Sequence, residues 1–172
     1  EIASAVAIAL KAAAELDIVH RDIKPDNIML DRKGLPKLAD LGLAKQMTSA
    51  RDNVTTTGVG MGTPLYVAPE QAMGDVTIDA RADIYSLGVT LYEMVTGVPP
   101  FGGATPYRII HQHLNEPLTD PRERNPAVSK DLAHVICKML AKKPEDRYQT
   151  AAELSADLAR LTDGETPIAL PT

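Results

Sequence analysis

The chain has 172 residues, of which 44% are hydrophobic, and a formal net charge of -5 at pH 7. A chain of this length can bury one substantial core, so we expect one domain or one large lobe. The acidic balance argues against a nucleic-acid partner, which would require a basic surface. The single cysteine, Cys137, excludes a disulfide framework and a thiolate metal cluster. We expect a protein of the reducing cytoplasm, with any membrane anchor of the complete protein outside this chain.

The first predicted element is a helix over residues 2–16. Its sequence, IASAVAIALKAAAEL, is rich in Ala and almost uncharged, so we expect it to be buried on most sides. In the next stretch, VHRDIKPDNIML over 19–30, the polar residues follow neither the alternation of a strand nor the period of an amphipathic helix. Apolar residues bound it at both ends, which predicts a loop anchored in the core. Loops of this kind often carry chemistry.

A short hairpin is expected after the polar loop. One strand ends at Leu30, residues 31–34 form a turn that contains Gly34, and a second strand covers 36–39. Residues 40–70 are rich in Gly and Thr and show no sustained period. A compact domain rarely keeps so long a loop unless the loop has a function.

Two helices are predicted next. The apolar segment 83–96 precedes Gly97, a favourable C-terminal cap. Thr105 and Pro106 have the composition of a helix start, with Pro at the first helical position.

Two further helices are predicted near the C-terminus. Ser129 can cap a helix with one apolar face, and Thr150 with Glu153 fits a capping box. The segment 167–172 predicts a frayed exit or the start of a linker.

Three short motifs occur in order along these elements. They are H-R-D-x-x-x-x-N over 20–27, D-L-G at 40–42 and A-P-E at 68–70, followed by Asp83 and Arg147. Together they resemble the eukaryotic-type protein kinase family, and the resemblance covers essentially the whole chain. The segments DIYSLGVTLYEMVTGVPPF and KKPEDRYQTAAEL resemble bacterial serine/threonine kinases of this type.

The resemblance implies the C-terminal lobe of the kinase fold, which is mainly α with a small β-hairpin. This lobe would occupy residues 1–162, and residues 163–172 would form an exit segment or the start of a linker. The Gly-rich loop, the V-A-I-K lysine and its partner Glu do not occur in the chain. We therefore expect the N-terminal lobe outside it, as the missing part of a truncated kinase or as a partner polypeptide.

The resemblance also implies transfer of the ATP γ-phosphoryl group to Ser or Thr of a protein, with Mg²⁺ or, as a substitute, Mn²⁺. Such transfer depends on positioning and on neutralisation of charge. Asp22 would accept the proton of the attacking hydroxyl, and Lys24 would place its charge on the transferred group. Asn27 and Asp40 would hold the metal. Met29 would lie beneath the adenine ring.

Lys24 and Thr63 indicate the substrate class. The forms D-x-K-x-x-N and GTPLYVAPE resemble serine/threonine kinases rather than tyrosine kinases. In the family, the residue at the position of Thr63 bonds to the Asp and Lys at the positions of Asp22 and Lys24. The alternative interpretation of the polar loop is an ordinary solvated turn.

Arg21 is expected to be regulatory. In the family, this Arg receives an activation-loop phosphate, and Thr55 and Thr57 are the favoured acceptors here. The phosphate would come from an activating kinase or from a dimer that phosphorylates in trans, and it would order the loop. A merely solvated set of threonines is the alternative.

Other residues have structural roles in the resemblance. Asp83 would bond to the backbone around His20 and Arg21, with a helix N-cap as the alternative. Glu70 and Arg147 match a buried ion pair, with a surface pair as the alternative.

Leu41 departs from the family pattern, which has Phe in D-F-G. Leucine keeps an apolar contact, so metal binding by Asp40 is still expected, but the switch between conformations would differ.

Other classes of protein account for these motifs less well. A pseudokinase would have lost one of Asp22, Lys24, Asn27 or Asp40, and all four are present. An interaction module remains the second hypothesis, because this chain alone does not assemble a complete kinase site.

Overall fold

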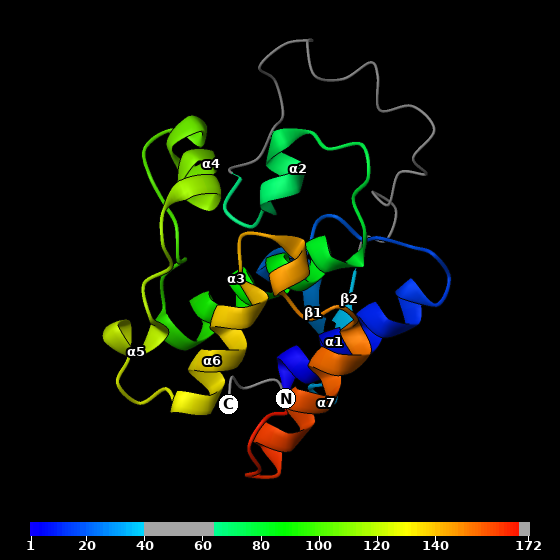
Figure 1. Ribbon diagram of the computed structural model, residues 1–172. Coiled ribbons are helices and arrows are strands. Elements are labelled where there is room, and N and C mark those ends of the chain that lie inside the picture. The colour runs from blue at the N-terminus through cyan, green and yellow to red at the C-terminus, as the bar shows by residue number, and fades with distance from the viewer. Residues whose placement is uncertain (40–63, 169–172) are drawn as a thin grey trace.

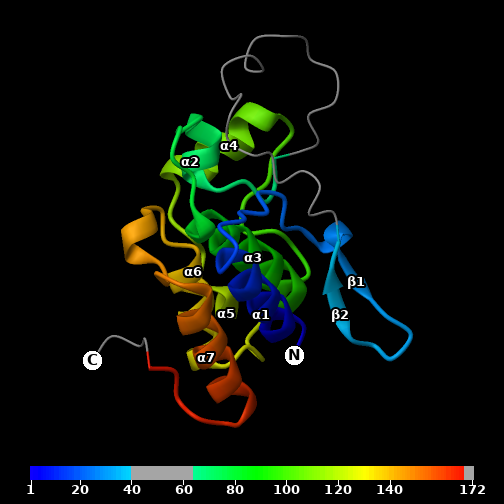
Figure 2. The ribbon, with the colours of Figure 1, turned by 90° about the vertical axis from the view of Figure 1, so that its right-hand side faces the viewer.

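The computed structural model describes residues 1–39 and 64–168. They form a helical body with a small hairpin on one side (Figure 1, Figure 2), which confirms the predicted class, mainly α with a β-hairpin. In chain order the elements are α1 (Ile2–Ala14), η1 (Pro25–Asn27), β1 (Ile28–Leu30), β2 (Pro36–Leu38), α2 (Pro69–Met73), α3 (Ala80–Thr96), α4 (Pro106–Asn115), α5 (Pro121–Arg124), α6 (Lys130–Met139), η3 (Pro144–Asp146) and α7 (Ala151–Thr162).

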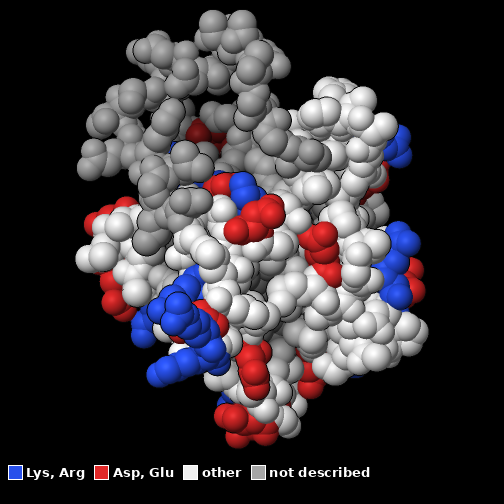
Figure 3. Space-filling view, turned by 180° about the vertical axis from the view of Figure 1, so that it is seen from behind, with Lys and Arg blue, Asp and Glu red and all other residues white. Residues whose placement is uncertain are grey.

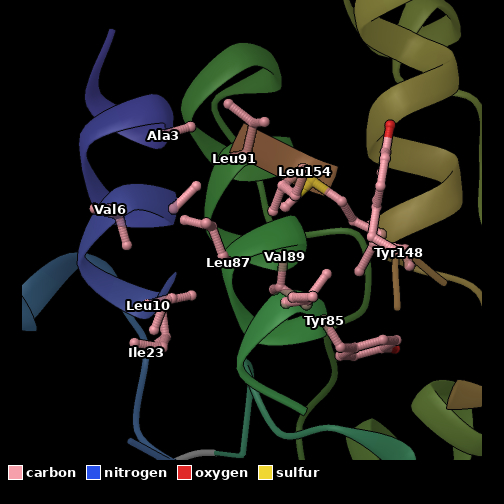
Figure 4. Close-up of a cluster of buried hydrophobic side chains, with 14 of the residues drawn as sticks. Ala3, Val6, Leu10, Ile23, Tyr85, Leu87, Val89, Leu91, Tyr148 and Leu154 are labelled. Carbon is pink, nitrogen blue, oxygen red and sulfur yellow. The ribbon is translucent and has the colours of Figure 1, made fainter. Parts of the chain in front are cut away.

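Helix α3 lies at the centre of the hydrophobic core. Its residues 82–92 are all buried, and α1, α6 and α7 pack around it. In Figure 4, Leu10 of α1 lies near Leu87 of α3, while Leu154 and Tyr148 lie on the other side. Burial of each large apolar side chain stabilises the fold by about 1.5–3 kcal/mol. This core is the platform on which the polar loop is held.

Helix α1 corrects one prediction. It buries a single face, formed by Ala3, Val6, Ala7 and Leu10, whereas Ile8 is 59% exposed. The spacing of the buried residues is that of one helical stripe. A nearly uncharged, Ala-rich sequence was therefore a poor indicator of burial on most sides, and the helix ends at Ala14 rather than at residue 16.

The hairpin forms as predicted, with one difference at its end. Ile28 pairs with Leu38 and Leu30 with Pro36 in an antiparallel register, so the second strand ends at Leu38 rather than at residue 39. The Asp31 carboxylate accepts hydrogen bonds from the backbone N–H groups of Lys33 and Leu35, at 2.8 and 3.0 Å. These two donors lower the pKa of Asp31. Gly34 adopts φ 78°, the left-handed conformation that the turn requires.

The predicted starts of α4 and α6 are confirmed. The Thr105 hydroxyl accepts from the Arg108 N–H, and Ser129 accepts from the Leu132 N–H. Helix α3 instead begins at Ala80, three residues earlier than predicted, because Asp79 is its N-cap and accepts from the Arg81 N–H.

The capping box of α7 is only half formed. Thr150 Oγ1 accepts from the Glu153 N–H at 3.1 Å, as predicted. The Glu153 carboxylate, however, accepts from the N–H of Gln149, at 2.9 Å. It therefore satisfies the donor that precedes the cap instead of the Thr150 N–H.

The expectation of a frayed exit is wrong for Pro167 and Ile168. Pro167 is buried, and the Ile168 N–H donates to the Asp157 carboxylate at 2.7 Å. Arg160 Nε also donates to the Thr166 carbonyl at 2.7 Å. Residues 164–168 thus fold back on α7, and residues 169–172 lie outside the described part. The domain boundary at residue 162 stays a prediction.

Surface charges of opposite sign are interspersed on the face that Figure 3 shows. Several pair locally, such as Arg81 with Asp79 at 2.7 Å and Arg160 with Glu165 at 3.0 Å. Exposed pairs of this kind contribute about 0–1 kcal/mol each. Among the helices of residues 1–39 and 64–168, none is both long and apolar enough to cross a bilayer.

Candidate active site

The polar loop is attached to the core at its centre. Ile23 is fully buried, although Asp22 and Lys24 on either side of it are partly exposed. Alternation of this kind fixes the backbone while both polar side chains stay accessible. The loop therefore presents Asp22 and Lys24 from a rigid support.

Asp83 holds the backbone of the same loop. Its two carboxylate oxygens accept hydrogen bonds from the N–H groups of His20 and Arg21, both at 2.7 Å. Asp83 lies in the first turn of α3 and is 2% exposed. Burial raises the pKa of this carboxyl, and the two N–H donors oppose that rise. The arrangement ties the loop to the central helix.

Asp22, Lys24 and Asn27 meet at one point. Lys24 Nζ donates to Asp22 Oδ2 at 2.7 Å. Asn27 Nδ2 donates to the Asp22 carbonyl at 2.7 Å and to Asp22 Oδ2 at 3.0 Å. The short helix η1 makes this possible, because its turn brings Asn27 back beneath Asp22.

The amide of Asn27 is oriented by these bonds. Because its nitrogen faces Asp22, its oxygen is left to serve as a ligand, and an oxygen donor suits Mg²⁺. In residues 1–39 and 64–168, no three His, Cys, Asp or Glu side chains gather as a metal site. The metal ligands expected from the sequence, Asn27 and Asp40, stay a prediction, because Asp40 lies outside the described residues.

His20 connects the loop to the hairpin. It is fully buried, and its Nε2 lies 3.0 Å from the Ala39 carbonyl. Since a carbonyl only accepts, Nε2 carries the proton, and Nδ1 accepts from the Asp22 N–H at 3.3 Å. The Ala39 N–H donates to the Asn27 carbonyl at 2.8 Å. The chain is therefore held next to the polar loop up to Ala39.

Met29 lies on β1 and is 60% exposed. It pairs across the hairpin with Lys37. The other predicted residues of this region, namely Asp40, Leu41, Thr55, Thr57 and Thr63, lie outside the described residues.

Glu70 and Arg147 form a buried bidentate pair. Arg147 Nη1 donates to Glu70 Oε1 at 2.7 Å, and Nη2 donates to Oε2 at 2.9 Å. The guanidinium also donates to the carbonyls of Ala141, Arg81 and Lys142. The pair joins α2 to the helical base with its hydrogen-bonding groups satisfied, which a buried charge requires.

Sequence reasoning missed the contacts that hold the segment 64–68. The Tyr66 hydroxyl donates to Glu93 at 2.6 Å, and burial, with this carboxylate beside it, raises the pKa of Tyr66. His113 of α4 is fully buried, and its Nε2 lies 3.0 Å from the carbonyl oxygen of Leu65. No local pattern marks these pairs, because each joins residues far apart in the chain.

A third missed residue is Gln71 of α2. Its side chain contacts the backbone of both Ala68 and Arg21. The local signal was a Gln three residues after the N-cap residue Ala68, a position typical of capping.

Comparison with known proteins identifies the family. The family model described as "Protein kinase domain" matches residues 1–157. The chain is 46% identical over 159 residues to "Serine/threonine-protein kinase PknB" of Mycobacterium tuberculosis (strain ATCC 25618 / H37Rv), covering 92% of this chain and 25% of the relative. For the protein of that name in Mycolicibacterium smegmatis, the identity is 44% over 167 residues, covering 97% of this chain and 27% of the relative.

A solved structure supports the same assignment. The structure titled "Crystal structure of Rad53 1-466 in complex with AMP-PNP" superposes with a TM-score of 0.69 and 28% sequence identity. The match covers 90% of this chain and 37% of that one. The chain belongs to the protein kinase family and has the fold of the C-terminal lobe. It spans about a quarter of the length of the curated relatives it matches.

Proposed function

We propose that the complete protein carrying this chain is a serine/threonine protein kinase. It transfers the γ-phosphoryl group of ATP to Ser or Thr hydroxyls of a protein substrate. The observation that carries the proposal is the cluster of Asp22, Lys24 and Asn27, joined by bonds of 2.7–3.0 Å on a loop anchored by Asp83. Phosphoryl transfer depends on such positioning more than on covalent work by the protein.

Each member of the cluster has a role in the proposed reaction. The Asp22 carboxylate orients the attacking hydroxyl and takes its proton. Lys24, already directed at Asp22, places its charge on the transferred phosphoryl group. A bound Mg²⁺ or Mn²⁺ would neutralise charge on the phosphate oxygens, and Asn27 and Asp40 would hold it.

Nucleotide binding is proposed for the exposed face of the hairpin. Met29 would lie beneath the adenine ring. Met29, Leu30 and Leu35 are each more than half exposed, but Met29 and Leu30 are neighbours on β1 and lie on opposite faces of the hairpin. We propose that the N-terminal lobe, which would cover the phosphates, packs on the face that carries Met29.

The substrate class and the regulation follow from the motifs. Lys24 and Thr63 favour Ser and Thr over Tyr as acceptors. A phosphate on Thr55 or Thr57 would pair with Arg21 and order the long loop. An activating kinase or a second copy of the same protein would supply it. Dependence on ATP and the single cysteine favour a cytoplasmic location.

The proposal is tested by incubating the complete protein with radiolabelled Mg²⁺-ATP and a generic basic protein. Acid hydrolysis of the product should yield phosphoserine or phosphothreonine, and EDTA should abolish labelling. The Asp22→Asn protein is the blank. Label on tyrosine alone would contradict the substrate class, and label equal to the blank would contradict the activity.

A further inference from the structure

Gln71 makes two side-chain hydrogen bonds with different partners. Its Oε1 accepts from the Ala68 N–H at 3.2 Å, at the start of its own helix. Its Nε2 donates to the Arg21 carbonyl at 3.1 Å, 50 residues away in the sequence. One side chain therefore links the end of the long loop to the loop that carries Asp22.

The residue that Gln71 contacts has an unusual backbone. Arg21 adopts φ 65°, a left-handed conformation that is uncommon for residues other than glycine and persists only where neighbours impose it. Its N–H donates to Asp83 Oδ1 at 2.7 Å, and its carbonyl accepts from Gln71. Both sides of the residue are thus held, from α3 and from α2.

The carbonyl of Arg21 and the N–H of Asp22 belong to one planar peptide unit. A bond that fixes this carbonyl therefore also fixes the direction of the Asp22 N–H, which donates to His20 Nδ1 at 3.3 Å. The orientation of the Asp22 side chain depends on this plane. Gln71 consequently acts on Asp22 without touching it.

We propose that Gln71 is a positioning residue for phosphoryl transfer, because its amide fixes the Arg21–Asp22 peptide plane and couples α2 to the catalytic loop. The proposal rests on the role of Asp22 in the proposed function. Helix α2 is also fixed by the neighbouring Glu70 through Arg147. The Gln71 amide therefore gives the segment before α2 a route to the loop that carries Asp22.

The Gln71→Glu variant separates the two bonds of this side chain. A carboxylate can still accept from the Ala68 N–H, but it cannot donate to the Arg21 carbonyl. We expect kcat of the complete protein to fall about 10- to 100-fold, since small misplacements of reacting groups have effects of this size. The KM for ATP should stay within about twofold, because Gln71 contacts no nucleotide position.

A pH profile adds a readout that a purely structural role would not change. In the Gln71→Glu variant, the new carboxyl group can donate again once it is protonated, and Glu carboxyls ordinarily titrate at about pH 4.3. About 6% of such carboxyls are protonated at about pH 5.5. The ratio of kcat for Gln71→Glu to kcat for wild type should therefore rise from about pH 7.5 to about pH 5.5, by about 1.5-fold if the loss at neutral pH is about 10-fold and by about 7-fold if it is about 100-fold. For Gln71→Met, which has no titrating group, the ratio should be low and flat. A flat ratio for Gln71→Glu, or kcat above half of wild type, would overturn the proposal.

The matched control is Gln149→Glu. Gln149 Nε2 also donates to backbone carbonyls, those of Pro144, Glu145 and Arg147, but these belong to the helical base. This variant should lose stability and keep its kcat. A comparable loss of kcat in Gln149→Glu would show a general effect of the substitution and would also overturn the proposal.

Amide hydrogen exchange tests the positioning independently of activity. The N–H groups of His20 and Arg21 should exchange faster in Gln71→Glu than in wild type, and at the wild-type rate in Gln149→Glu. Equal rates in Gln71→Glu and wild type would overturn the proposal. If the wild-type protein transferred no phosphoryl group, the proposed function would fail, while hydrogen exchange would still decide whether Gln71 holds this loop.

Discussion

The ion pairs of this lobe differ greatly in how much each stabilises the fold, and the difference follows from how deeply each pair is buried. Arg147 and Glu70 are 2% and 6% exposed and are joined at 2.7 and 2.9 Å. Arg160 and Glu165 are also close, at 3.0 Å, but their side chains are 39% and 57% exposed. Removing one partner of a buried pair leaves the other charge buried and uncompensated, which destabilises the fold. Removing one partner of an exposed pair costs little, because water screens the charge that remains.

Glu70→Ala should therefore lower the free energy of unfolding by about 3–5 kcal/mol. The double variant Glu70→Ala with Arg147→Met should recover part of this loss, because no buried charge remains. Glu165→Ala, the exposed control, should change stability by at most about 1 kcal/mol. Urea denaturation of these four proteins and of Arg147→Met alone measures these differences, and a double variant whose loss equals the sum of the two single losses would contradict the account.

His113 predicts a pH dependence of stability. Burial, with the Lys142 charge nearby, lowers the pKa of His113 from 6.5 to about 4. Between these values the unfolded chain binds a proton that the folded chain does not, so stability falls as the pH falls from about 6.5 to about 4. The full loss is about 3 kcal/mol, at about 1.36 kcal/mol per unit.

The check is the free energy of unfolding measured between about pH 7.5 and about pH 4. In His113→Gln this part of the dependence should disappear, whatever the effect on stability at neutral pH. His111→Gln, which changes an exposed histidine on the same helix, should keep the wild-type curve. A His113→Gln curve parallel to that of wild type would show that His113 is not the group responsible.

At the scale of elements, local signals predicted the fold well where they acted within one turn. Thr105 and Ser129 marked their helices because a cap and its donor are close in sequence. The start of α3 was misplaced because Asp83 resembles a cap, whereas Asp79 performs that role. Asp83 faces the loop at His20 instead, a contact that depends on tertiary structure.

Gly88 sets the distance between α3 and α6. A Cβ at this position would lie 2.8 Å from the Cβ of Met139 and 3.2 Å from Cγ of Leu140. Gly88→Ala gains about 1 kcal/mol of helix propensity, but overpacking in a core costs about 1–3 kcal/mol. The clash is with the Cβ of Met139, which is attached directly to the backbone and cannot move away by a side-chain rotation. The cost of overpacking should therefore lie in the upper part of this range.

We therefore expect Gly88→Ala to be destabilised by about 1–2 kcal/mol net. Gly102→Ala is the control, since a Cβ there meets nothing within 4 Å and φ is not positive. Thermal melting compares the two variants with wild type. A Gly88→Ala protein as stable as the wild type would mean that the two helices separate at little cost.

For the whole molecule, the sequence indicated which residues form the site better than how they are held. Asp22, Lys24 and Asn27 stood close together in a recognisable motif, and the structure brings them into contact. Gln71 and His113 could not be found in that way, because their partners Arg21 and Leu65 are 50 and 48 residues distant. Such contacts follow from the packing of α2 and α4 rather than from local propensity.

Residues 1–172 by themselves are expected to fold but to transfer phosphate poorly. The helices are capped and share one core, whereas the Gly-rich loop and the lysine that hold the phosphates do not occur in these residues. Cooperative melting together with negligible labelling of a basic protein would agree with this expectation. Labelling by this chain at the rate of the complete protein, abolished by Asp22→Asn, would contradict it.

The most direct test of the central claim is the turnover of the complete protein with Asp22 replaced by Asn. If Asp22 positions the hydroxyl and accepts its proton, steady-state turnover should fall about 10²- to 10⁴-fold, with nucleotide affinity nearly unchanged. Asp26→Asn, which makes the same change at an exposed position of the same loop, should keep the wild-type rate. An Asp22→Asn protein that retained more than about a tenth of the wild-type turnover would contradict the assigned role of Asp22.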